Sequence, residues 1–279
     1  MATAVTMNQR YHAGLASFKA RCTDHQAIKQ VMQNIFQDDV LGMASRFKRE
    51  SAAKVCDLGC GDGVITEQLV KNLASVKQGE GWLLELVEPV EDYLHKTRNR
   101  LTQFESEGNK TEIFNETAEE HFRMVQAGYD IVFSSHSMYF TPLDTFQKIY
   151  SSLKLGGFLV VLAMSRISIM AQLKNLFHQN KTSTIDDYVE LMEAKGFISN
   201  GNHCRQDFTS ELNISGFHFA NCIAELTEET KDILSLMLQR NVDDLSDDQY
   251  RTAKDTILER VNGHNLLLNN SIVVTKRVI

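Results

Sequence analysis

The chain has 279 residues, a length that fits one domain of about 150 residues with a large elaboration. Hydrophobic residues make up 43% and charged residues 23%, so the chain can bury a sizeable core and does not belong to the disordered class. The formal net charge is -7, which speaks against binding of nucleic acid through the phosphate backbone. The two prolines, Pro89 and Pro142, are too few for Pro-rich linkers.

The cysteines and the longest apolar run indicate the compartment. Five scattered cysteines without a C-x-x-C pair favour reduced thiols over a disulfide framework or a zinc site. The apolar run 155–164 holds two glycines and is far shorter than the roughly 20 residues of a membrane helix. The first residues lack the pattern of a secretory leader. We therefore expect a cytoplasmic protein with no membrane partner and no bound metal.

The hydrophobic period predicts helices first and alternating elements afterwards. Helices are expected over 11–20 and from Thr23 and Asp24 onward, where either side chain could cap the first turn. The strands predicted next are 53–58, 82–87, 111–114, 129–134 and 157–164. The helices predicted between them are 64–73, 90–104, 118–126 and 146–153. This alternation predicts crossover units and a mostly parallel sheet with helices on both faces.

Beyond residue 164 the alternation stops. The helices expected here are 167–177, 185–194, 226–240 and 247–261, and 197–208 is a candidate strand. The last segment, 265–279, is apolar and β-branched, so we expect it to return to the sheet as a late edge strand.

The most informative segment is DLGCGDG at 57–63, where the first strand should turn into a helix. Glycines there let the backbone approach a ligand at the carboxyl edge of the sheet. The spacing G-x-G-x-G is not the dinucleotide pattern G-x-G-x-x-G, and no G-K-[ST] of a phosphate loop follows. A ligand with a ribose but no pyrophosphate fits better, and a tight turn without a ligand is the alternative.

Glu88 ends the second predicted strand and is followed by Pro89. Its carboxylate is expected at the same edge of the sheet as the glycine turn, where it can accept hydrogen bonds from both ribose hydroxyls. A Glu-Pro pair at a strand end is otherwise a solvated turn, but its position after the glycine turn favours the ribose contact.

These segments, with YDIVF at 129–133 and LKLGGF at 153–158, resemble the motif series of class I S-adenosyl-L-methionine-dependent methyltransferases over about residues 50–165. The resemblance implies an α/β Rossmann-like fold with a mostly parallel seven-stranded sheet. It implies S-adenosyl-L-methionine as cofactor and S-adenosyl-L-homocysteine as product, without a metal. The residues that it assigns to the cofactor are Asp57, Gly59, Gly61, Glu88, Pro89, Thr117, Ala118 and Ser135. The usual K-P-G-G occurs here as KLGG at 154–157.

Flanking segments resemble histamine N-methyltransferase and its relatives, namely TDHQ at 23–26, HSMYF at 136–140 and LNNS at 268–271. The resemblance implies that Asp24, His136 and Asn270 hold the amine and ring of the substrate. It implies that the aromatic side chains at three further positions line the pocket, and these are Tyr11, Phe18 and Tyr139. Two departures are Phe140 in place of a tyrosine and the missing tryptophans after the fifth strand, which put histamine itself in doubt.

The resemblance also implies a division of the chain. Residues 1–47 would form an N-terminal helical lid, 48–165 the cofactor-binding core, and 166–279 the substrate-binding helices with the final strands. Such a layout is compatible with a monomer.

The proposed residue types suit methyl transfer to an amine. A positioned nucleophile is enough, because the methyl group of the cofactor is already electrophilic. Asp24 could hold a cationic substrate, and His136, as a histidine, could take up a proton near neutral pH. The alternatives are a helix cap for Asp24, a hydrogen-bonded core histidine for His136, and a turn for Asn270. The three aromatic residues could equally be core.

We therefore expect an N-methyltransferase for a small amine, with an imidazole or other aromatic group. One alternative is a small-molecule O-methyltransferase in which His136 deprotonates a hydroxyl. The other is a cofactor-binding protein without transferase activity.

Overall fold

The structure is a computed structural model that describes residues 6–48, 53–76, 81–124, 128–177, 183–217 and 219–278. Its strands form one eight-stranded sheet. They are β1 (Ala53–Leu58), β2 (Trp82–Val87), β3 (Lys110–Phe114), β4 (Tyr129–Ser135), β5 (Leu153–Met164), β6 (His203–Asn213), β7 (Val261–Asn262) and β8 (Asn265–Lys276).

The sheet has the order β3-β2-β1-β4-β5-β8-β6, and the short β7 pairs antiparallel with β8. β1 pairs in parallel with β2 and β4, β2 with β3, and β4 with β5. β1 and β2 are buried along nearly their whole length, as expected of parallel strands covered on both faces. The predicted mostly parallel, Rossmann-like α/β sheet is confirmed.

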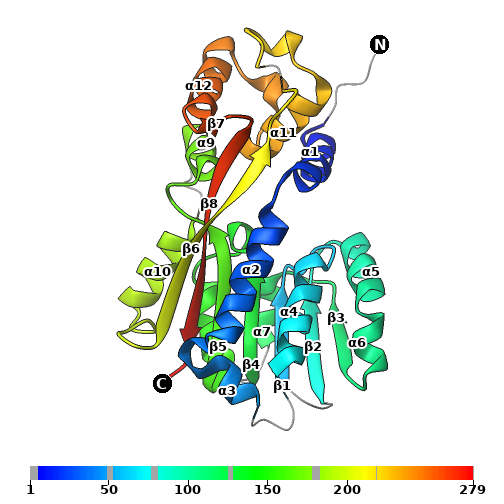
Figure 1. The fold of residues 1–279 in the computed structure, drawn as a ribbon, viewed down its shortest axis with the longest axis vertical. Coiled ribbons are helices and arrows are strands. Elements are labelled where there is room, and N and C mark those ends of the chain that lie inside the picture. Colours follow the sequence, from blue (N-terminus) through cyan, green and yellow to red (C-terminus); the bar gives the residue numbers. More distant parts are fainter. Residues whose placement is uncertain are drawn as a thin grey trace. The chain divides into compact units, whose positions relative to one another are not determined.

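Helices occupy both faces of this sheet, and Figure 1 shows α4 in front of β1 and β2 with α7 behind. The α-helices are α1 (Met7–Arg21), α2 (Asp24–Gln37), α3 (Met43–Phe47), α4 (Val64–Val76), α5 (Glu91–Arg100), α6 (Thr102–Ser106), α7 (Ala118–Met124), α8 (Thr145–Ser152), α9 (Ile169–Phe177), α10 (Ile185–Ala194), α11 (Glu228–Leu238) and α12 (Asp247–Leu258). The short 3-10 helices are η1 (Val40–Gly42), η2 (Met138–Phe140), η3 (Ile223–Glu225) and η4 (Val242–Asp244).

Local sequence explains where several helices begin. Thr6, Thr184 and Ser246 each cap a helix by accepting a hydrogen bond from the backbone N–H three residues later. In each case the side chain of that third residue bonds back to the cap, which completes a capping box. These reciprocal bonds satisfy backbone donors that the first turn of a helix leaves without partners.

The chain divides into two compact units. The first unit comprises Met1–Ala27, Met164–Thr182 and Phe208–Asn270, and the second comprises Ile28–Ala163, Ser183–Asp207 and Ser271–Ile279. The core of the second unit includes Cys56, Val132, Leu159 and Phe146, which come from β1, β4, β5 and α8. The core of the first unit is built from α9, α11, α12 and the parts of β6 and β8 that belong to it.

Several predicted elements differ from those observed. The segment 265–279 was expected at the edge of the sheet, but β8 lies between β5 and β6, so that expectation is wrong. β6, which carries alternating exposed residues, takes the edge instead. The single helix expected over 90–104 is two helices, because Leu101 leaves helical dihedral angles with φ -93° and ψ 6°. Residues 125 and 126, predicted as helix, lie outside the described residues.

β5 begins at Leu153 rather than at residue 157, and β6 covers His203–Asn213 rather than 197–208. In the described part of the chain, no helix combines the length and the apolar character needed to cross a membrane.

Candidate functional site

The glycine turn joins β1 to α4 in the second unit. Gly59 and Gly61 have φ of +65° and +56°, the left-handed region that glycine adopts without steric cost. A Cβ at Gly59 would lie 2.4 Å from the Cβ of Ser137, whereas a Cβ at Gly61 would meet no described atom within 4 Å. The turn is therefore packed against the chain at Gly59 and open at Gly61, as a loop that receives a ligand should be.

Glu88 ends β2 beside this turn. Its two carboxylate oxygens accept hydrogen bonds from the backbone N–H groups of Gly61 at 3.1 Å and Val90 at 3.0 Å. Burial of the side chain raises the pKa of Glu88, and these two hydrogen bonds oppose the rise. Each carboxylate oxygen can accept more than one hydrogen bond, so the group retains acceptor capacity for a ribose diol. Pro89, the next residue, is exposed.

Asp57 lies near the end of β1, just before the glycine turn, and its side chain hydrogen-bonds to another residue of the protein. Its carboxylate accepts a hydrogen bond from Thr66 of α4 at 2.6 Å. Complete burial raises the pKa of Asp57 to about 7, against the opposing effect of the Thr66 hydroxyl. This contact ties the end of β1 to the first turn of α4, and the predicted cofactor contact of Asp57 stays a prediction.

The remaining predicted cofactor residues follow β3 and β4. Thr117 stands at the start of α7, where its backbone N–H and hydroxyl donate to Glu120 at 2.9 and 2.8 Å, and Ala118 follows it. Ser135 is the last residue of β4. Because β1 to β4 run parallel, their carboxyl ends share one edge of the sheet. A carboxylate, an open glycine turn and small polar residues at that edge fit a nucleoside cofactor such as S-adenosyl-L-methionine.

His136 follows β4 directly and has φ +55°, which is uncommon for a residue with a side chain. Its backbone N–H donates to Leu162 of β5 at 2.8 Å, and its Nδ1 lies 2.9 Å from the hydroxyl of Tyr139. Backbone held in such a region is concentrated at functional sites. The structure thus brings His136 and Tyr139 together just after β4, whereas Phe140 is 67% exposed. Their role toward a substrate stays a prediction.

A second polar cluster lies in the first unit. The Oδ1 atom of Asp24 accepts hydrogen bonds from Ser210 at 2.9 Å and from the amide of Asn270 at 3.0 Å. The Asn270 amide also lies 3.3 Å from the Ser210 hydroxyl. Cys22 lies close by, and burial together with the Asp24 carboxylate raises the pKa of its thiol to about 12. We call Asp24, Ser210 and Asn270 the acid-amide cluster.

The sequence predicts Asp24 and Asn270 as site residues but misses Ser210. Ser210 is a buried polar residue in an alternating strand, and this pattern carries no functional signal by itself. The backbone N–H of Thr23 donates to the carbonyl of Glu211 at 2.9 Å, and the N–H of Glu211 donates to the Thr23 hydroxyl at 2.8 Å, so the start of α2 lies beside this part of β6.

Tyr11 and Phe18 belong to α1 in the first unit. Tyr11 is half-buried and packs edge-on against His12 at 5.8 Å between ring centroids. Phe18 is partly buried and packs against the core of that unit. Phe18 thus has a structural contact, and the predicted pocket-lining role of both residues stays a prediction.

One buried group has the composition of a metal site. Cys56, Glu85 and His121 offer ligand atoms within 4.8 Å of one another, and they form the one such group in the described ranges. Glu85 also binds the Lys54 ammonium at 2.6 Å and the Tyr129 hydroxyl at 2.5 Å. These partners already balance the charge of the carboxylate, so we assign the group to a structural ion network.

The fold is similar to that of several solved structures. A protein from Bacillus halodurans described as a methyltransferase has a TM-score of 0.53 and 14% identity, with 86% of this chain and 99% of that chain covered. The YcgJ protein of Bacillus subtilis has a TM-score of 0.51 and 12% identity, with coverages of 86% and 98%. A Galdieria sulphuraria protein described as a sarcosine dimethylglycine methyltransferase has a TM-score of 0.50 and 13% identity, with coverages of 88% and 85%.

A search of curated protein sequences gives no match. A family model for the methyltransferase domain matches residues 49–240, which is more than half of the chain and includes the glycine turn, Glu88 and His136. The chain therefore belongs to the methyltransferase-domain family, as a class I enzyme that depends on S-adenosyl-L-methionine.

Proposed function

We propose that the protein methylates a nitrogen atom of a small amine that carries a positive charge and an aromatic or imidazole ring. In this proposal residues 48–165 bind the cofactor, whereas residues 1–47 and 166–279 provide most of the contacts to the amine. His136, which belongs to the cofactor-binding segment 48–165, takes part in the proton transfer. The protein would act as a cytoplasmic monomer.

The observation that carries the proposal is the acid-amide cluster. The resemblance assigns Asp24 and Asn270, which lie in distant segments of the sequence, to the amine, and their side chains share a hydrogen bond of 3.0 Å. Asn270 and Ser210 are neutral donors, so they orient the carboxylate of Asp24 without cancelling its charge. A half-buried, oriented carboxylate is a suitable partner for an ammonium or imidazolium group.

The second requirement is removal of a proton, because an ammonium nitrogen has no lone pair to donate. His136 would take up this proton at Nε2 in the tautomer whose Nδ1–H donates to the oxygen of Tyr139. Tyr139 would thus fix the ring and its tautomer. The left-handed backbone of His136 supports a functional assignment for this residue.

The bound cofactor supplies a methyl group that is activated by a positively charged sulfur. Glu88 would bind the ribose hydroxyls, and the open side of Gly61 would admit the cofactor close to the backbone. Asp57, Pro89, Thr117, Ala118 and Ser135 remain proposed cofactor contacts.

A competing function is methylation of a hydroxyl, which the His136–Tyr139 pair would serve equally well by deprotonating the acceptor. The test is a screen of amines and matched phenols with isotopically labelled S-adenosyl-L-methionine, in which products are identified by mass. Labelled N-methyl products support the proposal. Labelled ethers without N-methyl products favour the hydroxyl acceptor, and binding of the cofactor without turnover of any acceptor would indicate a binding protein.

A further inference from the structure

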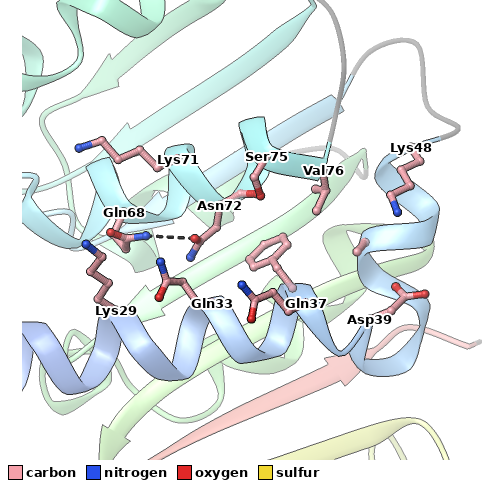
Figure 2. Close-up of a pocket in the computed structure, with 12 residues that line it drawn as sticks. Lys29, Gln33, Gln37, Asp39, Lys48, Gln68, Lys71, Asn72, Ser75 and Val76 are labelled. Atoms are coloured by element: carbon pink, nitrogen blue, oxygen red, sulfur yellow. Dashed lines mark hydrogen bonds between the residues drawn. The ribbon is translucent and has the colours of Figure 1, made fainter.

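A polar pocket lies between α2, α3 and α4 of the second unit, with a volume of about 480 Å³ (Figure 2). It is separate from the glycine turn. That turn leads directly into Val64 at the start of α4, whereas the pocket uses the later turns of the helix, from Gln68 to Val76. At 1.5 Å per residue, Asn72 stands about 12 Å along the helix from Val64.

The floor of the pocket holds a polar group without a complete set of partners. Asn72 is only 6% exposed, and its Oδ1 accepts a hydrogen bond from Gln68 at 3.0 Å. Its Nδ2 has no acceptor among the residues that the structure describes. Because the two amides bond to each other through one end of Asn72, the other end lacks a partner among the described residues in either orientation of the amides. Figure 2 shows the Asn72 side chain directed from α4 toward Gln33 of α2. A buried amide left in this state is destabilising, so it points to a ligand.

The lining carries an excess of positive charge. Lys29 comes from α2, Lys48 follows α3, and Lys71 comes from α4, where it also pairs with Glu67 at 2.5 Å. The only carboxylate that lines the described pocket is that of Asp39. An anion is therefore the ligand that these charges favour.

Asp39 is already engaged by the chain. Its Oδ1 accepts a hydrogen bond from the backbone N–H of Ser45 at 2.8 Å, and its Oδ2 accepts one from the Ser45 hydroxyl. These bonds lower the pKa of Asp39, so it stays ionised but is turned toward Ser45. The charge of Lys48 also helps to lower that pKa, and the ammonium groups of Lys29 and Lys48 both line the pocket.

The rest of the lining suits a hydroxylated body. Gln33 and Gln37 project from α2 toward α4, as Figure 2 shows, and Ser75 lines the pocket from α4. Primary amides both donate and accept, so they pair well with hydroxyl groups. Lysines bind phosphate as point charges.

We propose that this pocket binds a phosphate monoester of a small hydroxylated molecule. The cofactor of methyl transfer contains no phosphate, so this ligand is distinct from it. The site does not depend on which acceptor the enzyme methylates.

The test uses the full chain, with glucose 6-phosphate as probe and glucose and inorganic phosphate as matched controls. Binding of glucose 6-phosphate is measured by calorimetric titration and by the rise in Tm that accompanies ligation of a folded state. We expect saturable binding of glucose 6-phosphate, weaker binding of inorganic phosphate, and none of glucose. Equal affinity for glucose and glucose 6-phosphate, or no binding of the phosphate ester, overturns the proposal.

Variants locate the binding. The double variant Lys29→Gln and Lys48→Gln should weaken glucose 6-phosphate binding about tenfold or more, since each charge contributes to holding the anion. Lys148→Gln, at an exposed lysine of α8, is the control and should leave the affinity unchanged. Asn72→Leu should weaken binding as well, and retained binding of S-adenosyl-L-homocysteine shows that each variant is folded. Full affinity in the double lysine variant contradicts the proposal, even if Asn72→Leu fails to fold.

Discussion

The side-chain amide of Asn270 donates a hydrogen bond of 3.0 Å to the carboxylate of Asp24, although 246 positions separate the two residues in the chain. The Ser210 hydroxyl reaches the same carboxylate oxygen at 2.9 Å. All three residues belong to one compact unit, so their arrangement is a property of that unit alone. Asp24 lies in the first turn of α2, and its carboxylate is also bound by Ser210 of β6 and Asn270 of β8.

Asp24→Asn should raise the KM for a cationic amine by about ten- to a hundredfold, because a hydrogen bond to a charged group contributes about 1.5–3 kcal/mol. The affinity for S-adenosyl-L-homocysteine should not change. Steady-state kinetics with an identified amine and calorimetric titration of the cofactor product measure the two effects. Asp255→Asn, at an exposed acid of the same unit, is the matched control. An unchanged KM would leave Asp24 with a structural role in the first turn of α2.

Ser210→Ala should produce a milder form of the same defect, since Ser210 positions the carboxylate and need not touch the amine. We expect a several-fold rise in KM with little change in kcat, because the lost bond orients the Asp24 carboxylate and does not hold the amine directly. Ser210→Thr, which keeps the hydroxyl, should restore the KM. A change in kcat alone would speak against a positioning role.

Glu88→Ala should weaken binding of S-adenosyl-L-homocysteine by ten- to a hundredfold, because it removes the carboxylate proposed to accept from two ribose hydroxyls, at about 1.5–3 kcal/mol. It also removes the acceptor for the Gly61 N–H. Glu91→Ala, at an exposed acid of α5, serves as the control for the loss of one negative charge. Undiminished binding in Glu88→Ala, measured by calorimetry, would disprove the ribose assignment.

His136→Ala should lower kcat by about a hundredfold or more, the usual range for loss of a general base. Steady-state kinetics with an identified amine measure this loss. Tyr139→Phe should lower kcat less, because the imidazole remains and loses only its hydroxyl partner at Nδ1. An unchanged kcat in His136→Ala would assign the proton transfer to another group.

The sequence was sufficient to predict the mostly parallel sheet and the glycine turn at its carboxyl edge. Strands such as Trp82–Val87 are buried along nearly their whole length and are apolar except at Glu85. Glycines at every second position mark the turn before α4. The position of β8 inside the sheet could not be predicted, because apolar β-branched residues suit an edge and an interior strand alike.

The sites were predictable only in part, for a related reason. Ser210 became a candidate because its hydroxyl binds the carboxylate of Asp24. Asn72 became one because its amide, within the described ranges, binds only Gln68 and leaves one end without a partner. No spacing in the sequence signals the contact of Ser210 with Asp24, since it joins segments whose separation is set by the whole fold. Gln68 and Asn72 are four residues apart on one helix, but the burial of Asn72 depends on what packs against that helix. Their chemistry becomes visible only when the burial and the partners of each polar atom are known.

The ion network of the second unit gives a prediction for stability against pH. Burial opposes ionisation of Glu85, but hydrogen bonds from His121, Lys54 and Tyr129 lower its pKa to about 2. Burial likewise opposes the cationic form of His121, but the carboxylates of Glu85 and Glu116 raise its pKa. The contribution of Glu85 to stability is thus present above its ordinary pKa and is lost as the pH falls toward 2. That of His121 is present below its ordinary pKa and is lost as the pH rises through the raised value.

Both contributions are complete between the two ordinary pKa values, at about pH 4.5–6.5. Glu85→Gln should therefore lower the free energy of unfolding most in that window, by about 2–4 kcal/mol, because it leaves Lys54 and His121 without their carboxylate. Denaturant unfolding at several pH values, compared with Glu112→Gln at an exposed neighbouring position, measures the difference. If the wild-type and Glu85→Gln curves run parallel at all pH values, the network does not couple folding to protonation, and the loss comes from packing alone.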